Sequence, residues 1–238
     1  MATVKKPHGK NTRANLKPAH ISDADYDTMI GRSHLKELAS WPPPMHILEY
    51  LNTFVAFIED NLATGTILDL GCGDGAIDMI LAEHSPKRKI TGIDLEAHVQ
   101  WKLPTPANLT FQAESIYDLP FNPKSFDIVM MKDVLHHMPD PEKTLHEVAK
   151  LAKKQVLVIE ANRYNPVSFI RMVKIAKHEH FSQAKLKKIV GRPATLITTE
   201  THVWPGPTRI PGKINDVVFN SIPLLSKLRN YNFIIFEP

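Results

Sequence analysis

The chain has 238 residues, 43% of them hydrophobic and 23% charged, and a formal net charge of +4 at pH 7. This composition is typical of a globular chain with a sizeable core and excludes a fibrous or largely disordered one. No apolar run approaches the ~20 residues that span a bilayer, and the start of the sequence lacks the hydrophobic core of a signal peptide. The single cysteine, Cys72, leaves no internal disulfide. We therefore expect a cytoplasmic protein without a membrane span.

Basic residues are concentrated at the N-terminal end, where five lysines and arginines precede the first acidic residue, Asp23. This end contains proline and glycine and shows no apolar periodicity. We therefore predict that residues 1–20 form a disordered, solvated tail and that residues 21–238 form one domain. An electrostatic arm for RNA is the alternative, although no aromatic residues are interleaved with the basic ones.

A helical pattern follows the tail. Residues 21–40 are predicted to be helical in parts, and Pro42–Pro44 open a longer helix, because proline is tolerated in a first turn. The apolar residues of that helix recur at the spacing of one helical face, which predicts packing on a sheet. These residues are Ile47, Leu48, Leu51, Phe54, Val55, Ile58 and Leu62.

The most informative stretch is a short apolar run, Ile67–Leu70, that leads into glycines at positions 71, 73 and 75 and then into a helical pattern. It predicts a buried strand, a tight turn and a helix N-terminus. Glycine allows positive φ and lets a ligand lie against the backbone. Two carboxylates, Asp69 and Asp74, would oppose a diphosphate here. They suit an ammonium and a sulfonium, so the turn favours S-adenosylmethionine over a dinucleotide.

Further strands alternate with helices up to residue 160. Lys89–Asp94 ends in a carboxylate, at the end of a strand where open α/β sheets bind ligands, and such an acid can accept hydrogen bonds from both ribose hydroxyls. Asp140 and Pro141 begin a helix. The alternation predicts a doubly wound, parallel α/β sheet. Its other predicted strands are Leu109–Gln112, Ser125–Met131 and Gln155–Glu160.

The region after residue 161 is less regular. An apolar helical stretch around Phe169–Ile175 precedes a helix that Ser182 caps and Gly191 ends. Two β segments, 195–203 and 231–236, flank a proline- and glycine-rich loop and a last helix near 224–228.

Several ordered motifs together resemble the class I S-adenosylmethionine-dependent methyltransferases, specifically their type 11 branch, which includes quinone-biosynthesis and other small-molecule enzymes. The motifs are Asp69–Gly75, Leu119–Phe121, Ser125–Val129 and Val134–Pro141. The resemblance implies a Rossmann-like, mostly parallel seven-stranded sheet that closes with a C-terminal antiparallel hairpin. It also implies a cofactor half at about 42–160 and a lid and sheet-closing half at about 161–238.

The resemblance further assigns S-adenosylmethionine contacts. Asp69 and the glycine turn would hold the methionine part, Asp94 and Leu95 the ribose, and Lys132 would line the pocket, with Asp133 beside it. Tyr26 or Trp41 could cover the cofactor, although packing is the simpler role for both. The glycine turn would contact the cofactor through Gly71, Cys72 and Gly73. The side chain of Cys72 is interpreted as a small packing residue.

The adenine contact departs from the family pattern. An aspartate often follows the third strand in the resembled family, whereas this chain has Ser115 in that position, preceded by Glu114. Ser115 can still accept a hydrogen bond, Glu114 can reach in, and Ile116 can offer its backbone. We assign these three residues to the adenine.

Histidines provide the candidates for acid–base chemistry. His136 and His137 follow the fourth strand, and His137 is the candidate general base if the acceptor must lose a proton, although a structural role for the pair is the simpler interpretation. Asp133 is a further candidate base, but a role at the start of the following helix is the simpler interpretation for it. His178 and His180 look like a metal pair, but no third ligand is evident, so we predict a solvated polar turn and no metal site; contact of His180 with substrate is the alternative.

The predicted function is methyl transfer from S-adenosylmethionine to an O, N or C nucleophile of a small molecule, with a sugar-, lipid- or quinone-like acceptor. One alternative is a nucleic-acid methyltransferase that uses the basic tail. The other is a non-catalytic partner subunit that keeps the fold. The sequence does not indicate the oligomeric state.

Overall fold

The computed structural model describes residues 41–43, 45–166, 169–175, 180–199 and 221–238. The predicted tail at 1–20, the helical segment at 21–40, and Tyr26 and His178 lie outside the described residues.

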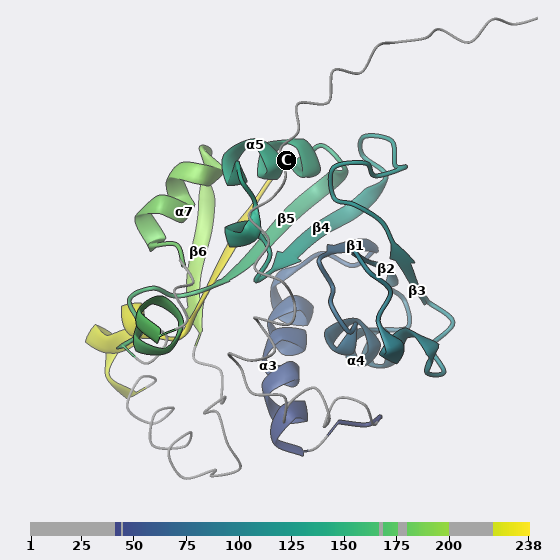
Figure 1. Cartoon of the computed structure of the whole chain (residues 1–238), viewed down its shortest axis with the longest axis horizontal. Coiled ribbons are helices and arrows are strands. Elements are labelled where there is room, and N and C mark those ends of the chain that lie inside the picture. The colour runs from purple at the N-terminus through teal and green to yellow at the C-terminus, as the bar shows by residue number, and fades with distance from the viewer. Residues whose placement is uncertain (1–40, 44, 167–168, 176–179, 200–220) are drawn as a thin grey trace, which may run out of the picture.

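A seven-stranded sheet forms the centre of the molecule, in the order β3-β2-β1-β4-β5-β7-β6 (Figure 1). Strands β1 to β5 run parallel, and β7 is antiparallel to both of its neighbours, β5 and β6. The expected doubly wound sheet with a C-terminal antiparallel pair is therefore confirmed. The strands are β1 (Thr66–Leu70), β2 (Lys89–Asp94), β3 (Leu109–Ala113), β4 (Phe126–Lys132), β5 (Ala152–Ala161), β6 (Ala194–Thr199) and β7 (Tyr231–Phe236).

Helices cover both faces of the sheet. Helices α3 (Met45–Asn61) and α4 (Ala76–His84) lie on one side, and α5 (Pro141–Ala149) and α7 (Gln183–Val190) lie on the other (Figure 1). The described residues also form short 3-10 turns at η1 (Val99–Lys102), η2 (Leu135–His137) and η4 (Pro223–Leu228). The segment Phe169–Ile175 (η3), expected as an ordinary helix, is a π-helix, and the expected last helix is the 3-10 turn η4.

Two apolar cores result, because successive side chains of a strand point to opposite faces of the sheet. Ile67 of β1 packs beneath α3 and α4, whereas its neighbour Leu68 packs beneath α5 and α7. Both side chains are fully buried. Burial on both faces explains why the parallel strands read as nearly continuous hydrophobic runs in the sequence.

The helix ends follow the local sequence signals. The Asp140 carboxylate accepts a hydrogen bond from Lys143 N at 3.0 Å, with Pro141 as the first helical residue of α5. The Ser182 hydroxyl accepts one from Lys185 N at 3.1 Å, and Gly191 ends α7 in the left-handed region with φ 64°. These caps satisfy N–H and C=O groups that a helix leaves unpaired at its ends.

The order of the strands locates the binding edge of the sheet. The chain builds β1, β2 and β3 outward in one direction and then returns to place β4 on the other side of β1. Ligands of open α/β sheets bind outside the carboxyl ends of the strands at such a reversal. The site is therefore expected beside the ends of β1, β2 and β4.

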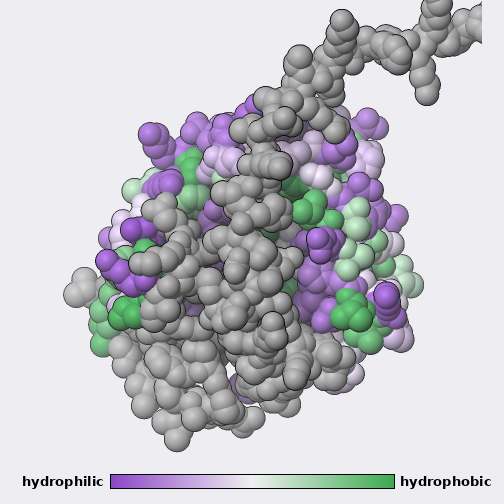
Figure 2. All heavy atoms as spheres, in the orientation of Figure 1, coloured by the Kyte–Doolittle hydropathy of each residue, from purple (hydrophilic) through white to green (hydrophobic). Residues whose placement is uncertain are grey.

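On the face shown in Figure 2, the described surface is mainly hydrophilic, with separate hydrophobic patches. Among the described helices, none combines the length and the apolar character needed to cross a membrane.

Candidate active site

The turn after β1 has the backbone conformation that its glycines predict. Gly71, Gly73 and Gly75 adopt φ of 77°, 57° and 76°, all in the left-handed region that other residues rarely occupy. Gly71 N donates a hydrogen bond to Ile93 O at 2.7 Å, which fixes the turn to the neighbouring strand β2. Gly75 is the N-cap of α4, so unpaired N–H groups of the helix lie next to the turn.

The surroundings of the three glycines differ. A Cβ on Gly71 would lie 2.1 Å from Val134 Cγ2, and a Cβ on Gly75 would lie 2.3 Å from Phe111 Cζ. A Cβ on Gly73 would meet nothing within 4 Å. Gly71 and Gly75 are therefore required by packing as well as by φ, whereas Gly73 faces open space where a ligand can approach the backbone.

Asp94 joins this turn to the end of β2. Its Oδ2 accepts a hydrogen bond from Gly73 N at 2.9 Å, and its Oδ1 accepts one from Leu95 N at 2.7 Å. Burial alone would raise the pKa of this carboxyl, but hydrogen bonding from His98 and from the backbone N–H groups outweighs burial and lowers it. Asp94 is therefore an ionised acceptor at neutral pH, and each oxygen retains lone pairs for further donors.

Two buried acids lie under the turn. Asp69 is only 4% exposed and Asp78, from the first turn of α4, is fully buried. Burial raises the pKa of Asp69 to about 7, although the neighbouring Asp78 and Lys132 lower it. Burial and the charge of Asp69 raise the pKa of Asp78 well above its usual value. At neutral pH the pair therefore carries a proton, which Asp78 holds more strongly.

This protonation changes the electrostatic argument made from the sequence. Burial raises the pKa of Asp74 as well, despite a hydrogen bond from Ala76 N. Asp94, whose pKa is lowered, is therefore a more certain negative charge of the site than Asp69, whose pKa is about 7. The Cys72 thiol has a strongly raised pKa because it is desolvated and surrounded by acids, which supports its interpretation as a packing residue.

Trp101 packs over the turn. Its Nε1 donates a hydrogen bond to Gly73 O at 3.0 Å, and its ring stacks on Phe111 with centroids 5.0 Å apart and an interplanar angle of 8°. Trp101 therefore ties the carbonyl of Gly73 to η1, the 3-10 turn that follows β2.

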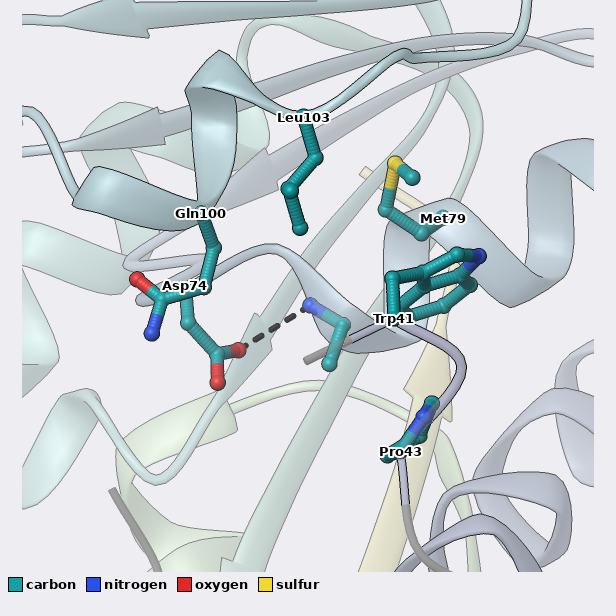
Figure 3. A pocket seen from close by; sticks show the side chains of 7 residues that line it. Trp41, Pro43, Asp74, Met79, Gln100 and Leu103 are labelled. Carbon is teal, nitrogen blue, oxygen red and sulfur yellow. Dashed lines mark hydrogen bonds between the residues drawn. The ribbon is translucent and has the colours of Figure 1, made fainter. Parts of the chain in front are cut away.

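A pocket, which we call the outer pocket, lies beside the turn (Figure 3). Trp41 lines this pocket together with Asp74, whose carboxylate accepts a hydrogen bond from Ala76 N at 3.0 Å. Asp94 and the residues after β3 are not among its lining residues, so we do not assign the cofactor to this pocket. The other lining residues are Pro43, Ala76, Met79, Gln100 and Leu103.

The residues assigned to adenine begin next to Asp94, because Asp94 pairs with Ala113 across β2 and β3. Glu114 is exposed, and its N donates to Asp94 O at 2.9 Å. Ser115 Oγ accepts a weak hydrogen bond from Tyr117 N at 3.3 Å. Leu95 is 58% exposed, which leaves an apolar surface beside Asp94 for a flat ring.

Lys132 and Asp133 stand at the end of β4. Asp133 adopts a positive φ of 54°, a left-handed conformation that aspartate tolerates better than most residues other than glycine. Its Oδ2 accepts hydrogen bonds from Lys132 Nζ and, at 3.0 Å, from Tyr231 OH. The Lys132 ammonium also lies 4.8 Å from the centre of the Phe54 ring and 5.3 Å from that of Tyr231. The side chain of Lys132 is therefore held by this aromatic and acidic group.

Three histidines lie near the carboxyl end of β4, and their environments differ. His137 is exposed, whereas the His136 side chain is 2% exposed and its Nδ1 lies 2.6 Å from Glu160 Oε2. His180, expected in a solvated turn, is 4% exposed and lies against His136 with ring centroids 4.7 Å apart. That expectation is wrong for His180, because the chain after β5 returns it to the sheet edge.

The structure thus brings the predicted site residues together in two groups along one edge of the sheet. The first group surrounds the glycine turn and contains Asp69, Asp94, Leu95 and the segment 114–116. The second group lies at β4 and contains Lys132 and His137. Sequence reasoning missed Asp78 and Trp101, which carry no motif, although the helical phase of Asp78 beneath a glycine turn was a usable signal.

The sequence model of one protein family, described as a methyltransferase domain, matches residues 62–196, more than half of the chain. The chain therefore belongs to the methyltransferase domain family. Its sheet has the order and strand directions of the class I S-adenosylmethionine-dependent methyltransferases. The expected class is confirmed; membership of the type 11 branch stays a prediction.

Individual relatives agree with this class. An uncharacterized methyltransferase of Schizosaccharomyces pombe is 29% identical over 133 residues, 51% of this chain and 46% of the relative. A ubiquinone biosynthesis O-methyltransferase of Neisseria meningitidis is 30% identical over 123 residues, 47% of this chain and 50% of the relative. The matched segments thus span about half the length of these curated relatives.

A solved structure shares the fold across most of the chain. The plantazolicin methyltransferase BpumL, in complex with S-adenosylhomocysteine, superposes with a TM-score of 0.57 at 14% identity, covering 90% of this chain and 88% of BpumL. At this identity the similarity establishes the fold.

Proposed function

We propose that this chain binds S-adenosylmethionine at the glycine turn and transfers its methyl group to an O, N or C nucleophile of a small molecule. The observation that carries the proposal is the ionised Asp94 carboxylate, bonded to Gly73 N at 2.9 Å beside a turn that is open at Gly73. The BpumL complex with S-adenosylhomocysteine supports the same cofactor for this fold.

The residues of the turn fit this cofactor. The two oxygens of Asp94 each have an acceptor position left for a ribose hydroxyl. Gly73 admits close approach of the methionine part, and Leu95, 58% exposed, offers an apolar surface to the adenine. Asp69, with a pKa of about 7, can ionise when a cationic ammonium approaches. Glu114, Ser115 and Ile116 follow β3 beside Asp94 and would complete the adenine side.

S-adenosylmethionine supplies a methyl group on a cationic sulfur, which a nucleophile displaces in line. The chain must hold the two reactants collinear, and such positioning can contribute several kcal/mol, up to ~7–11 in ideal cases. The acceptor would lie beside β4, where Lys132 is held in place and His137 is exposed. His137 is the proposed base for an acceptor that must lose a proton.

A small-molecule acceptor is supported by the relative from ubiquinone biosynthesis, an O-methyltransferase that is 30% identical over the matched segment. We propose a hydroxyl-bearing, quinone-like acceptor on that ground. A sugar-like or lipid-like acceptor would use the same edge of the sheet.

Calorimetric titration with S-adenosylmethionine tests the cofactor assignment. We expect one binding site per chain and a loss of roughly 10- to 100-fold in affinity for Asp94→Asn, because charge-assisted hydrogen bonds contribute about 1.5–3 kcal/mol. Asp60→Asn, which changes an exposed aspartate at the end of α3, is the matched control and should bind as the wild type does. An unchanged affinity in Asp94→Asn would refute the ribose assignment.

Transfer is tested by incubating the chain with methyl-labelled S-adenosylmethionine and a cell extract divided into metabolites and nucleic acid. The proposal expects label in the metabolite fraction. Label in RNA would support the nucleic-acid alternative instead. Tight cofactor binding with no label in either fraction would favour a non-catalytic partner subunit.

A further inference from the structure

Three metal-ligating side chains meet at the carboxyl ends of β4 and β5. His136 belongs to the 3-10 turn after β4, Glu160 lies near the end of β5, and His180 precedes α7. One ligand atom from each of them lies within 4.8 Å of the others. The His136 Nδ1 to Glu160 Oε2 distance is 2.6 Å.

This cluster is buried rather than a chance meeting of surface groups. The side chains of His136 and Glu160 are 2% and 0% exposed, and His180 is 4% exposed. Buried ionisable groups are costly unless they are paired or coordinate a metal. His180 brings a second imidazole to the same point, so the carboxylate lies between two possible nitrogen ligands.

The local charge also suits a cation. Asp133, the next carboxylate, is close enough to interact electrostatically with both His136 and His180. Its Oδ1 is buried and has no hydrogen-bond partner among the described residues. Glu160 and Asp133 together can balance a double positive charge, while Lys132 bonds to the other oxygen of Asp133 and offsets part of its charge.

We propose that His136, Glu160 and His180 bind one divalent transition-metal ion of the zinc and cobalt class. Two imidazoles and one carboxylate are a donor set that such ions prefer, whereas magnesium and calcium prefer oxygen ligands. Ligands of one zinc ion lie at about 2.0–2.2 Å from it, hence roughly 3–4 Å from one another, so the three side chains need to move by about 1 Å. The ion replaces the hydrogen bond between His136 and Glu160 and joins the segment before α7 to the sheet.

Cobalt binding tests this site directly. The untagged full chain is treated with chelator, exchanged into chelator-free buffer and titrated with Co²⁺, whose visible d–d absorption reports imidazole coordination. Zn²⁺ and Mg²⁺ are then added as competitors. We expect one Co²⁺ per chain, displacement by Zn²⁺ but not by Mg²⁺, and a higher Tm with the metal, because the ion binds the folded chain.

The variant His180→Ala should lose roughly 100-fold or more in Co²⁺ affinity together with the rise in Tm, since it removes one of three ligands. His84→Ala, which changes an exposed histidine of α4, should bind Co²⁺ as the wild type does. If His180→Ala does not fold, His180→Gln keeps a polar side chain in the buried position and carries the same expectation.

Wild-type protein without saturable one-to-one binding, or His180→Ala with wild-type affinity, would overturn the metal site. Titration of the same preparations with S-adenosylmethionine keeps this result separate from the proposed function. Cofactor binding without metal binding overturns only the metal site, and metal binding without cofactor binding overturns only the proposed function.

Discussion

The carboxylate of Asp94 accepts a hydrogen bond from the backbone N–H of Gly73 at 2.9 Å, so the end of β2 is tied to the turn that follows β1. Gly73 also accepts a hydrogen bond, because Trp101 Nε1 donates to Gly73 O at 3.0 Å. The glycine whose Cβ position meets no other atom is thus hydrogen-bonded through both its N–H and its C=O. A cofactor that reaches Asp94 must contact this turn as well.

The three glycines allow a paired test of packing against backbone strain. Gly71→Ala should lower the free energy of unfolding by roughly 3 kcal/mol, because its Cβ would lie 2.1 Å from Val134 Cγ2 at a positive φ. Gly73→Ala should lower it by only about 1–2 kcal/mol, since it has the strained φ but no clash. Urea denaturation measures both values.

The matched control is the double variant Gly71→Ala, Val134→Ala. Because removal of the Val134 branch makes space for the new Cβ, part of the lost stability should return. If Gly71→Ala and Gly73→Ala lose the same free energy of unfolding, the contact with Val134 does not determine the loss in Gly71→Ala.

The buried pair of Asp69 and Asp78 predicts a pH dependence of stability. The pKa of Asp69 rises from 3.8 to about 7 in the folded chain, because burial disfavours its charge. The folded chain therefore holds a proton that the unfolded chain has released, so this contribution is fully present below pH 3.8 and is lost as the pH rises through about 7. We expect the free energy of unfolding to fall between pH 5 and pH 8.

Asp78→Asn tests this pair, because asparagine has the same shape, cannot ionise and can donate to Asp69. It should raise the free energy of unfolding at pH 8 by about 2 kcal/mol and flatten its decline with pH. Asp60→Asn serves as the control and should follow the wild-type curve. Urea denaturation at pH 5.5 and pH 8 measures these free energies. If the free energy of unfolding fell equally with pH in Asp78→Asn and in the wild type, the buried pair would not cause the pH dependence.

Trp101 should report cofactor binding through its fluorescence. Its indole contacts Gly73 O at 3.0 Å and stacks on Phe111 with centroids 5.0 Å apart, so a ligand on the turn changes its surroundings. Titration with S-adenosylmethionine should change the emission of wild-type protein, and Trp101→Phe should remove most of that change. Trp41→Phe should retain it, because Trp41 lines the outer pocket and contacts Glu83. If Trp41→Phe instead removed the change in emission and Trp101→Phe retained it, the cofactor would lie in the outer pocket.

Tyr231 supports the strained backbone at Asp133. Its hydroxyl donates to Asp133 Oδ2 at 3.0 Å and lies 3.1 Å from Tyr50 OH. Tyr231→Phe should lower the free energy of unfolding by about 1–2 kcal/mol, the cost of leaving a charged acceptor with one donor fewer. Tyr50→Phe should cost less, since the bond from Tyr231 to Asp133 remains. A larger loss for Tyr50→Phe in urea denaturation would show that the Asp133 bond is the lesser one.

The order of elements and much of the cofactor site could be predicted from the sequence, because their signals are local. Apolar runs that end at Leu70 and Asp94 define strands, and glycines at 71, 73 and 75 require a turn with positive φ. Ser182 and Gly191 mark the two ends of one helix by the same local chemistry.

Tertiary structure alone decided the partners of side chains that are distant in sequence. His180 looked like part of a solvated turn, and only the return of the chain after β5 buries it against His136 and Glu160. Likewise, Asp69 looked like a fixed negative charge, but burial beneath the turn raises its pKa to about 7. The sequence determined which backbone conformations form, since φ preferences and hydrophobic periodicity act within a few residues. Burial and charge depend on neighbours across the fold, so they appear only when the sheet brings those neighbours together.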